Sequence, residues 1–272
     1  MKIRSQYNTR RRIIELVTNL KEIENAVRRG HGTVGLSQVA WITPISFLPI
    51  VVYASRYHVS IDCAEKKPDV LGYLGSICFP EGTTKLSERQ KNFLPITRLS
   101  CNDKNNLLSK YEDRILCKVH EENRSPFSTS LKYLTSELES NVREHADVDD
   151  YWIFAQYWPR MRTCEIAMCD TGIGYKDSYV GTMYEVANHI DAIKNALEGR
   201  SSKSLQERGA GIPSIVRMFV EGYQGEMVIM SGDSLLHAYS GERIGYKFSL
   251  LWPGSFVGLR FRLREINIYD YL

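Results

Sequence analysis

Apolar residues recur at helical spacing between residues 131 and 146. At about 100° per residue, four apolar residues lie on one side of a helix: Leu131, Leu134, Leu138 and Val142. The far side carries polar residues that we expect to meet water, namely Ser136, Glu139, Ser140 and Arg143. The pattern therefore predicts an amphipathic helix that packs on a core through its leucines.

A stripe of polar residues borders this apolar face. Glu137, Asn141 and His145 are four residues apart, so they share one side of the helix, centred roughly 65° from the leucines. A carboxylate and an amide at the border of a core cost desolvation energy unless something pairs with them. We interpret the stripe as a ligand site, with a satisfied structural network as the alternative.

Hydrophobic periodicity divides the chain near the polar, turn-rich segment 120–130. The elements predicted before it are helices at 13–27, 69–79 and 107–120, strands at 33–42, 58–63 and 93–99, and a buried strand leading into a helix at 38–54. The elements predicted after the stripe helix are a hairpin of 151–158 and 164–170, helices at 184–199 and after 209–211, and strands at 226–232, 246–252 and 256–263. The fold class is α/β.

The composition is that of an ordinary globular protein. The 272 residues are 43% hydrophobic and 25% charged, which suits one large domain or two modest ones. A net charge of +3 does not indicate nucleic-acid binding, although residues 8–12 and 27–32 are locally basic. The six cysteines show no CxxC and no paired metal spacing, so we expect reduced thiols, no zinc and a cytoplasmic protein. The sequence has no run of about 18 apolar residues and no signal-type start, so we expect no membrane segment.

A carboxylate stands at the end of an alternating strand. Residues 164–170 end in Asp170 and run directly into Gly172 and Gly174. A fixed acceptor beside glycine backbone lets a flat ligand approach closely, and an aminopurine fits that description. Asp-Gly pairs are also common in ordinary turns, which is the alternative.

Two further glycine segments follow. Gly209 and Gly211 precede a helix with Pro213 in its first turn, and exposed amides at a helix start can hold a phosphate. By itself this segment is equally typical of a glycine turn that caps a helix. Gly254 and Ser255 form a turn entering the last strand, which alone indicates only a loop.

Together, Glu-x-x-x-Asn, Asp-x-Gly-x-Gly, Gly-x-Gly before a helix and a final Gly-Ser strand resemble the nucleotide boxes of the GHKL ATPase superfamily. That superfamily includes DNA gyrase, a heat-shock chaperone class, the MutL proteins and histidine kinases. The resemblance covers residues 128–264 and implies ATP and Mg²⁺ as ligands. It also implies a two-layer α/β sandwich, in which helices cover one face of a mixed sheet.

The resemblance implies a role for individual residues. Asn141 would hold Mg²⁺, Asp170 would accept a hydrogen bond from the adenine amino group, and residues 175–208 would form a mobile lid. The implied nucleotide contacts are Asn141, Asp170, Gly172, Gly174, Lys203, Arg208, Gly209, Gly211 and Ser255. Ser255 stands where the family usually has threonine, so the hydroxyl is kept.

Glu137 distinguishes branches of this superfamily. Histidine kinases usually carry asparagine here, whereas the ATP-hydrolysing branch and the anti-sigma serine kinases carry glutamate. A carboxylate that deprotonates water or a protein hydroxyl makes phosphoryl transfer plausible, so we expect slow ATP hydrolysis. The alternatives are a serine/threonine kinase of the anti-sigma type and a module that binds nucleotide without turnover. His145 matches a histidine of the anti-sigma kinases, but a structural role for it is at least as well supported.

The N-terminal part is similar to the STAS-like α/β modules that precede such ATPase domains in some bacterial proteins. This similarity rests on strand order and on the "ITP" and "YL" positions. It implies a STAS-like regulatory or docking module at 1–123, followed by the ATP-binding domain at 124–272. We therefore expect a nucleotide-gated regulator that acts on a protein partner, with a homodimer also compatible and with no membrane or nucleic-acid partner.

Overall fold

The computed structural model describes residues 2–35, 42–63, 66–86, 94–103, 106–200 and 211–271. Its α-helices are α1 (Lys2–Arg29), α2 (Pro44–Arg56), α3 (Pro68–Ser76), α4 (Leu107–Lys118), α5 (Glu121–His145), α6 (Gly174–Ser178), α7 (His189–Leu197) and α8 (Gly211–Ile215). The π-helix η2 (Val216–Gly222) continues α8, and 3-10 turns form η1 (Pro159–Met161) and η3 (Ile268–Asp270). The strands are β1 (Thr33–Gly35), β2 (Ser60–Asp62), β3 (Thr97–Ser100), β4 (Asp150–Trp158), β5 (Thr163–Cys169), β6 (Glu226–Tyr239) and β7 (Glu242–Arg262). The predicted α/β class is confirmed.

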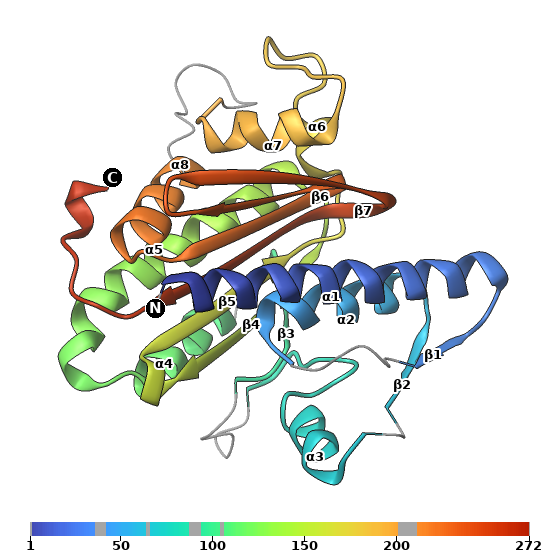
Figure 1. The fold of residues 1–272 in the computed structure, drawn as a ribbon, viewed down its shortest axis with the longest axis horizontal. Helices are drawn as coiled ribbons and strands as arrows, with labels where there is room; N and C mark the ends of the chain where they lie inside the picture. Colours follow the sequence, from blue (N-terminus) through green and yellow to red (C-terminus); the bar gives the residue numbers. More distant parts are fainter. Residues whose placement is uncertain are drawn as a thin grey trace.

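A five-stranded sheet lies at the centre of the molecule (Figure 1). Its strand order is β3-β4-β5-β7-β6, and each neighbouring pair is antiparallel. The predicted hairpin is confirmed as β4 and β5, which are joined through η1. A mixed sheet was predicted, and for the described strands of this sheet that prediction is wrong. The short connections between β4 and β5 and between β6 and β7 allow only antiparallel pairing of the strands that they join. A separate parallel pair joins β1 and β2.

Helices cover both faces of the sheet. On β5, Cys164, Ile166 and Met168 join the core that contains α5, whereas Ala167 and Cys169 join the core built with α1 and α2; this is the two-residue alternation of a strand. Helices on one face only were predicted for 124–272, and α5, α7 and α8 do share one core; the cover of the other face by α1 and α2 was not predicted (Figure 1). The physical reason is α2, which is buried from Pro44 through Ala54 and therefore needs an apolar partner on nearly every side.

The predicted amphipathic helix is confirmed as part of α5. Its four apolar residues are all buried in the core on that side of the sheet: Leu131, Leu134, Leu138 and Val142. The turn-rich break predicted at 120–130 is wrong, because α5 begins at Glu121 and runs through this segment. Glu121 and Glu122 suit the positive end of the helix dipole, and Phe127, which is 1% exposed, anchors the first turns in the core.

The N-terminal and C-terminal parts share the sheet. Strand β3 pairs with β4, and α2 packs against β4, β5 and β7. The predicted strands at 33–42 and 58–63 include β1 and β2, although residues 36–41 lie outside the described ranges. The division into modules at 1–123 and 124–272 stays a prediction, and in this fold the two parts would not have separate cores.

The β6–β7 hairpin bends sharply near Ser231. The register shifts twice between Ser231 and Ser234, and Gly232 has a φ of 58°. The His237 Nε2 lies 3.0 Å from Glu226 Oε2 on the same strand, whereas eleven residues of straight strand would span about 36 Å. The far half of the hairpin therefore folds back toward the start of β6.

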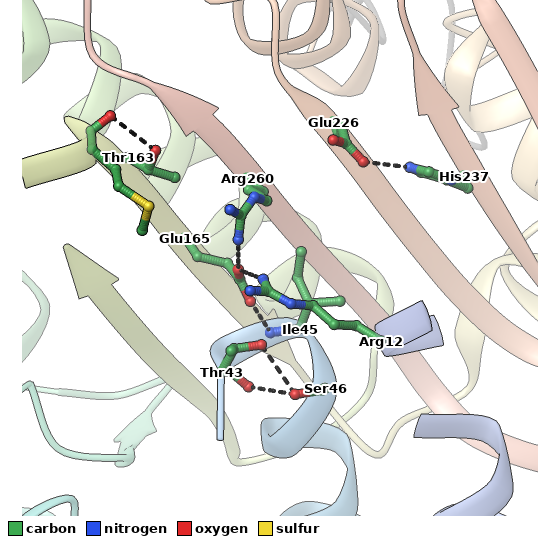
Figure 2. A network of polar contacts seen from close by, with 10 residues as sticks. Arg12, Thr43, Ile45, Ser46, Thr163, Glu165, Glu226, His237 and Arg260 are labelled. Atoms are coloured by element: carbon green, nitrogen blue, oxygen red, sulfur yellow. Dashed lines mark hydrogen bonds and ion pairs between the residues drawn. The ribbon is translucent and has the colours of Figure 1, made fainter. Parts of the chain in front are cut away.

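A buried charged network ties the N-terminal helices to the sheet (Figure 2). Glu165 of β5 is 0% exposed and forms ion pairs with Arg12 of α1 and Arg260 of β7. Its other oxygen accepts a hydrogen bond of 2.9 Å from the Ile45 amide, in the first turn of α2. One carboxylate thus joins two helices and two strands.

Among the described residues, no helix is both long enough and apolar enough to span a bilayer.

Candidate functional site

Asp170 is fixed where β5 ends. The residue is 1% exposed, and Oδ1 accepts hydrogen bonds from the Gly172 amide at 2.8 Å and the Ser255 amide at 3.3 Å. Oδ2 accepts a hydrogen bond of 2.5 Å from the Ser255 hydroxyl. The acid and the final Gly-Ser segment, which were predicted to act together, are therefore in direct contact.

Three glycines make this arrangement possible. A side chain at Gly172 would overlap the Ala146 carbonyl at the end of α5, and one at Gly254 would overlap Asp170. At Gly174, whose φ is 72°, a Cβ would come within 2.5 Å of the Ser231 hydroxyl and 2.8 Å of the Gly254 carbonyl. Glycine is needed at each point because backbone from three segments meets there.

Burial raises the pKa of Asp170 above its ordinary value, and the hydrogen bonds from Ser255 and Gly172 oppose this shift. The Tyr175 hydroxyl lies close by: burial first, and then the charge of Asp170, raises its pKa, while a hydrogen bond with Ser255 opposes the rise. A carboxylate offers about four acceptor positions, and the three hydrogen bonds to Asp170 occupy most of them. A further hydrogen bond comes from the backbone of Asp170 itself.

The helix α5 links this acid to the start of α8. At its end, the Ala146 carbonyl accepts a hydrogen bond of 3.1 Å from the Ile173 amide. Two and a half turns earlier, Glu137 lies against Gly211, where any side chain would overlap the carboxylate. The predicted base and a glycine of the predicted phosphate segment are therefore neighbours.

Asn141 lies between these two contacts on α5. Its side-chain Nδ2 is buried without a hydrogen-bond partner, which is uncommon for a buried amide and calls for an explanation. An unpaired donor suits an acceptor of a ligand, such as a phosphate oxygen, whereas a metal ion would need the amide Oδ1. The metal role of Asn141 therefore stays a prediction. His145, one turn further, is half-buried.

Part of the predicted site lies outside the described residues. Lys203, Arg208 and Gly209 fall in the segment 201–210, of which nothing is described. In the predicted lid, Asn188 caps α7, because its side chain accepts a hydrogen bond from the Asp191 amide. Ile193 and Leu197 of α7 are buried in the same core as α5. That part of the lid is thus packed on the body of the protein.

Sequence reasoning missed Ser231. This residue is 1% exposed, and its hydroxyl contacts both Gly254 and Tyr175. The adjacent Gly232 was a visible sign of irregular backbone, but no sequence pattern links Ser231 to Asp170, which lies 61 positions earlier.

Within the described ranges, no group of three or more His, Cys, Asp or Glu side chains is arranged to hold a metal. A site with Asn141 as its protein ligand would take its remaining ligands from phosphate and water, as Mg²⁺ commonly does. The chain matches no protein-family model and no curated protein. The geometry must therefore carry the functional argument.

Proposed function

We propose that the protein binds Mg²⁺-ATP along α5 and at the ends of β5 and β7, hydrolyses it slowly, and signals its nucleotide state to a protein partner. The observation that carries the proposal is the contact of Glu137 with Gly211 on the same helix that reaches the Asp170 site. Helix α5 therefore carries the candidate base Glu137, contacts Gly211 of the predicted phosphate segment, and contacts the turn that follows Asp170.

Each residue has a distinct part in this proposal. Asp170 accepts a hydrogen bond from the base, and Gly172 and Gly174 let the neighbouring backbone segments pack closely around this carboxylate. Asn141 holds the metal, which neutralises charge on the phosphates. Glu137 takes the proton from the attacking water, and backbone amides from Gly211 onward face the phosphates at the start of a helix that continues to Gly222.

Replacing Asn141 by Ala tests the metal and nucleotide role. Wild-type protein should melt at a higher temperature with Mg²⁺-ATP, because a ligand that binds only the folded state stabilises it. Asn141→Ala should lose most of this shift, while Asn123→Ala, near the other end of α5, should keep it. Thermal shift with and without Mg²⁺ measures the effect, and equal shifts in the wild type and Asn141→Ala would remove this residue from the site.

Replacing Asp170 by Asn tests the base contact. The amide can still accept hydrogen bonds from the Gly172 and Ser255 amides, but it presents a donor where adenine also has one. Leaving buried donors facing one another costs about 1–3 kcal/mol, so ATP affinity should fall about 10- to 100-fold and preference over GTP should disappear. Direct titration with both nucleotides measures this, with Asp177→Asn as the exposed control. An unchanged ATP preference would make Asp170 an ordinary turn acid.

The same variant has a predictable effect on stability. Because the pKa of folded Asp170 is raised, its contribution to stability is present at low pH and is lost as pH rises through the folded pKa. At neutral pH the charge therefore costs stability, which Asp170→Asn removes. Without nucleotide, the melting temperature of the variant relative to the wild type should therefore rise as the pH increases from about 4 to 7, because only the wild type carries the buried charge.

Radiolabelled ATP separates the proposed function from its alternatives. Release of inorganic phosphate supports hydrolysis, whereas transfer of label to a co-purified protein would replace it with kinase activity. Retention of intact ATP would leave a binding module.

A further inference from the structure

Ser231 occupies the point where β6 bends. It is the last residue of β6 before the register with β7 shifts, it pairs with Ser255, and its side chain is buried. The hydroxyl donates a hydrogen bond of 2.9 Å to the Gly254 carbonyl and accepts one of 3.1 Å from the Tyr175 amide. The hydroxyl therefore uses its one donor and one of its two acceptor positions.

These two hydrogen bonds hold the segments on either side of Asp170. Gly254 precedes Ser255, whose amide and hydroxyl both donate to the Asp170 carboxylate. Tyr175 is the second residue of α6, after Gly174, and its own hydroxyl hydrogen-bonds Ser255. Ser231 thus sets how the final strand and the glycine turn meet around the carboxylate.

We propose that Ser231 is a positioning residue that fixes the acceptor geometry of Asp170 and so determines the preference for adenine. The inference rests on the proposed function, because it assigns base selectivity to the same site. Its physical basis is that a buried acceptor discriminates between donors only while its own position is fixed. Ser231 touches neither the base nor the phosphates and acts through Ser255 and Tyr175.

The Ser231 hydroxyl lies in close contact with the glycine turn. Gly174 carries no side chain, and a Cβ there would lie 2.5 Å from the Ser231 hydroxyl. Alanine at 231 removes the donor for Gly254 and the acceptor for Tyr175 while keeping the backbone. Threonine keeps the hydroxyl and tests whether this group, rather than the size of the side chain, is responsible.

The first test uses the protein without nucleotide. Amide hydrogen exchange at Tyr175 should be at least tenfold faster in Ser231→Ala than in the wild type, because the hydroxyl that accepts from this amide is gone. Ser231→Thr should retain protection, and Ser249→Ala, at an exposed serine of β7, should behave as the wild type. Unchanged exchange at Tyr175 would overturn the positioning role, whatever nucleotides do.

The second test is direct titration with Mg²⁺-ATP and Mg²⁺-GTP. Ser231→Ala should bind ATP about tenfold more weakly and lose most of the preference over GTP, with kcat at saturating ATP close to wild type. Wild-type selectivity in Ser231→Ala would overturn the inference, whereas a wild-type protein that binds neither nucleotide would overturn the proposed function instead. If Ser231→Ala does not melt cooperatively, Ser231→Cys carries both tests, since a thiol is only a weak hydrogen-bonding group.

Discussion

Replacing Glu137 by Gln is expected to lower ATP turnover by about 10²-fold or more while Mg²⁺-ATP affinity stays close to wild type. Gln keeps the size of the side chain beside Gly211 but cannot take a proton from water. Because Asn141 holds the metal in the proposed site, Glu137 is not needed for binding. Steady-state phosphate release and a binding titration on the same preparation measure the two effects.

The control should be an exposed carboxylate of α5 whose hydrogen bond a glutamine can keep. Glu139 was predicted to meet water, but it is half-buried and accepts hydrogen bonds of 2.9 Å from the Tyr151 hydroxyl and from Arg143. Glu144 is exposed and accepts from the Ser140 hydroxyl, which Gln can also do. Glu144→Gln should therefore change neither turnover nor binding.

Two outcomes would contradict the base assignment. Turnover of Glu137→Gln at the wild-type rate would show that another group activates water, or that none is needed. Binding lost together with turnover would show that Glu137 holds the ligand or the α5–α8 contact rather than the proton.

Local periodicity predicted those parts of the fold that depend on one element alone. The leucine face of α5 and the alternation in β5 follow from spacing along the chain, and both are buried as expected. The same spacing could not show that Glu139 meets Tyr151, because a helix shows which residues share a face but not what lies opposite. The wrong break at 120–130 has a similar origin: polar residues and Pro126 suggest a turn, while burial of Phe127 favours the helix.

The candidate site was predictable only where the chain folds back on itself at short range. Asp170, Gly172 and Gly174 lie within five positions, so their turn was predictable from the sequence, whereas the family resemblance named Ser255 only as a nucleotide contact and its contact with Asp170 was not predicted. Ser231 was not predictable, because its role depends on the bend of β6 and on the pairing of β6 with β7. The second helical layer was missed for the same reason, since Arg12 and Glu165 are 153 positions apart.

Replacing Glu165 by Ala is expected to cost about 3–5 kcal/mol of unfolding free energy, the usual effect of breaking a buried ion pair from one side. The change leaves the guanidinium groups of Arg12 and Arg260 without their shared carboxylate and the Ile45 amide without its acceptor. Burial already lowers the pKa of Arg12, and Glu165 is the main group that opposes this shift. Urea unfolding measures the loss, and hydrogen exchange along α1 should show that this helix is released first.

A double-mutant cycle separates the ion pair from general packing. Arg12→Ala should destabilise strongly, while Arg11→Ala, beside it on α1 and bonded to Glu15 in an exposed pair, should change stability by less than about 1 kcal/mol. Because removal of both partners leaves less uncompensated charge than removal of either one, Arg12→Ala with Glu165→Ala should cost clearly less than the two single changes added together. Two results would contradict this role of the ion pair: additive losses of unfolding free energy in the double mutant, or a loss below about 1 kcal/mol for Glu165→Ala alone. Either result would mean that apolar packing of α1 and α2, and not the charged network, holds these helices on the sheet.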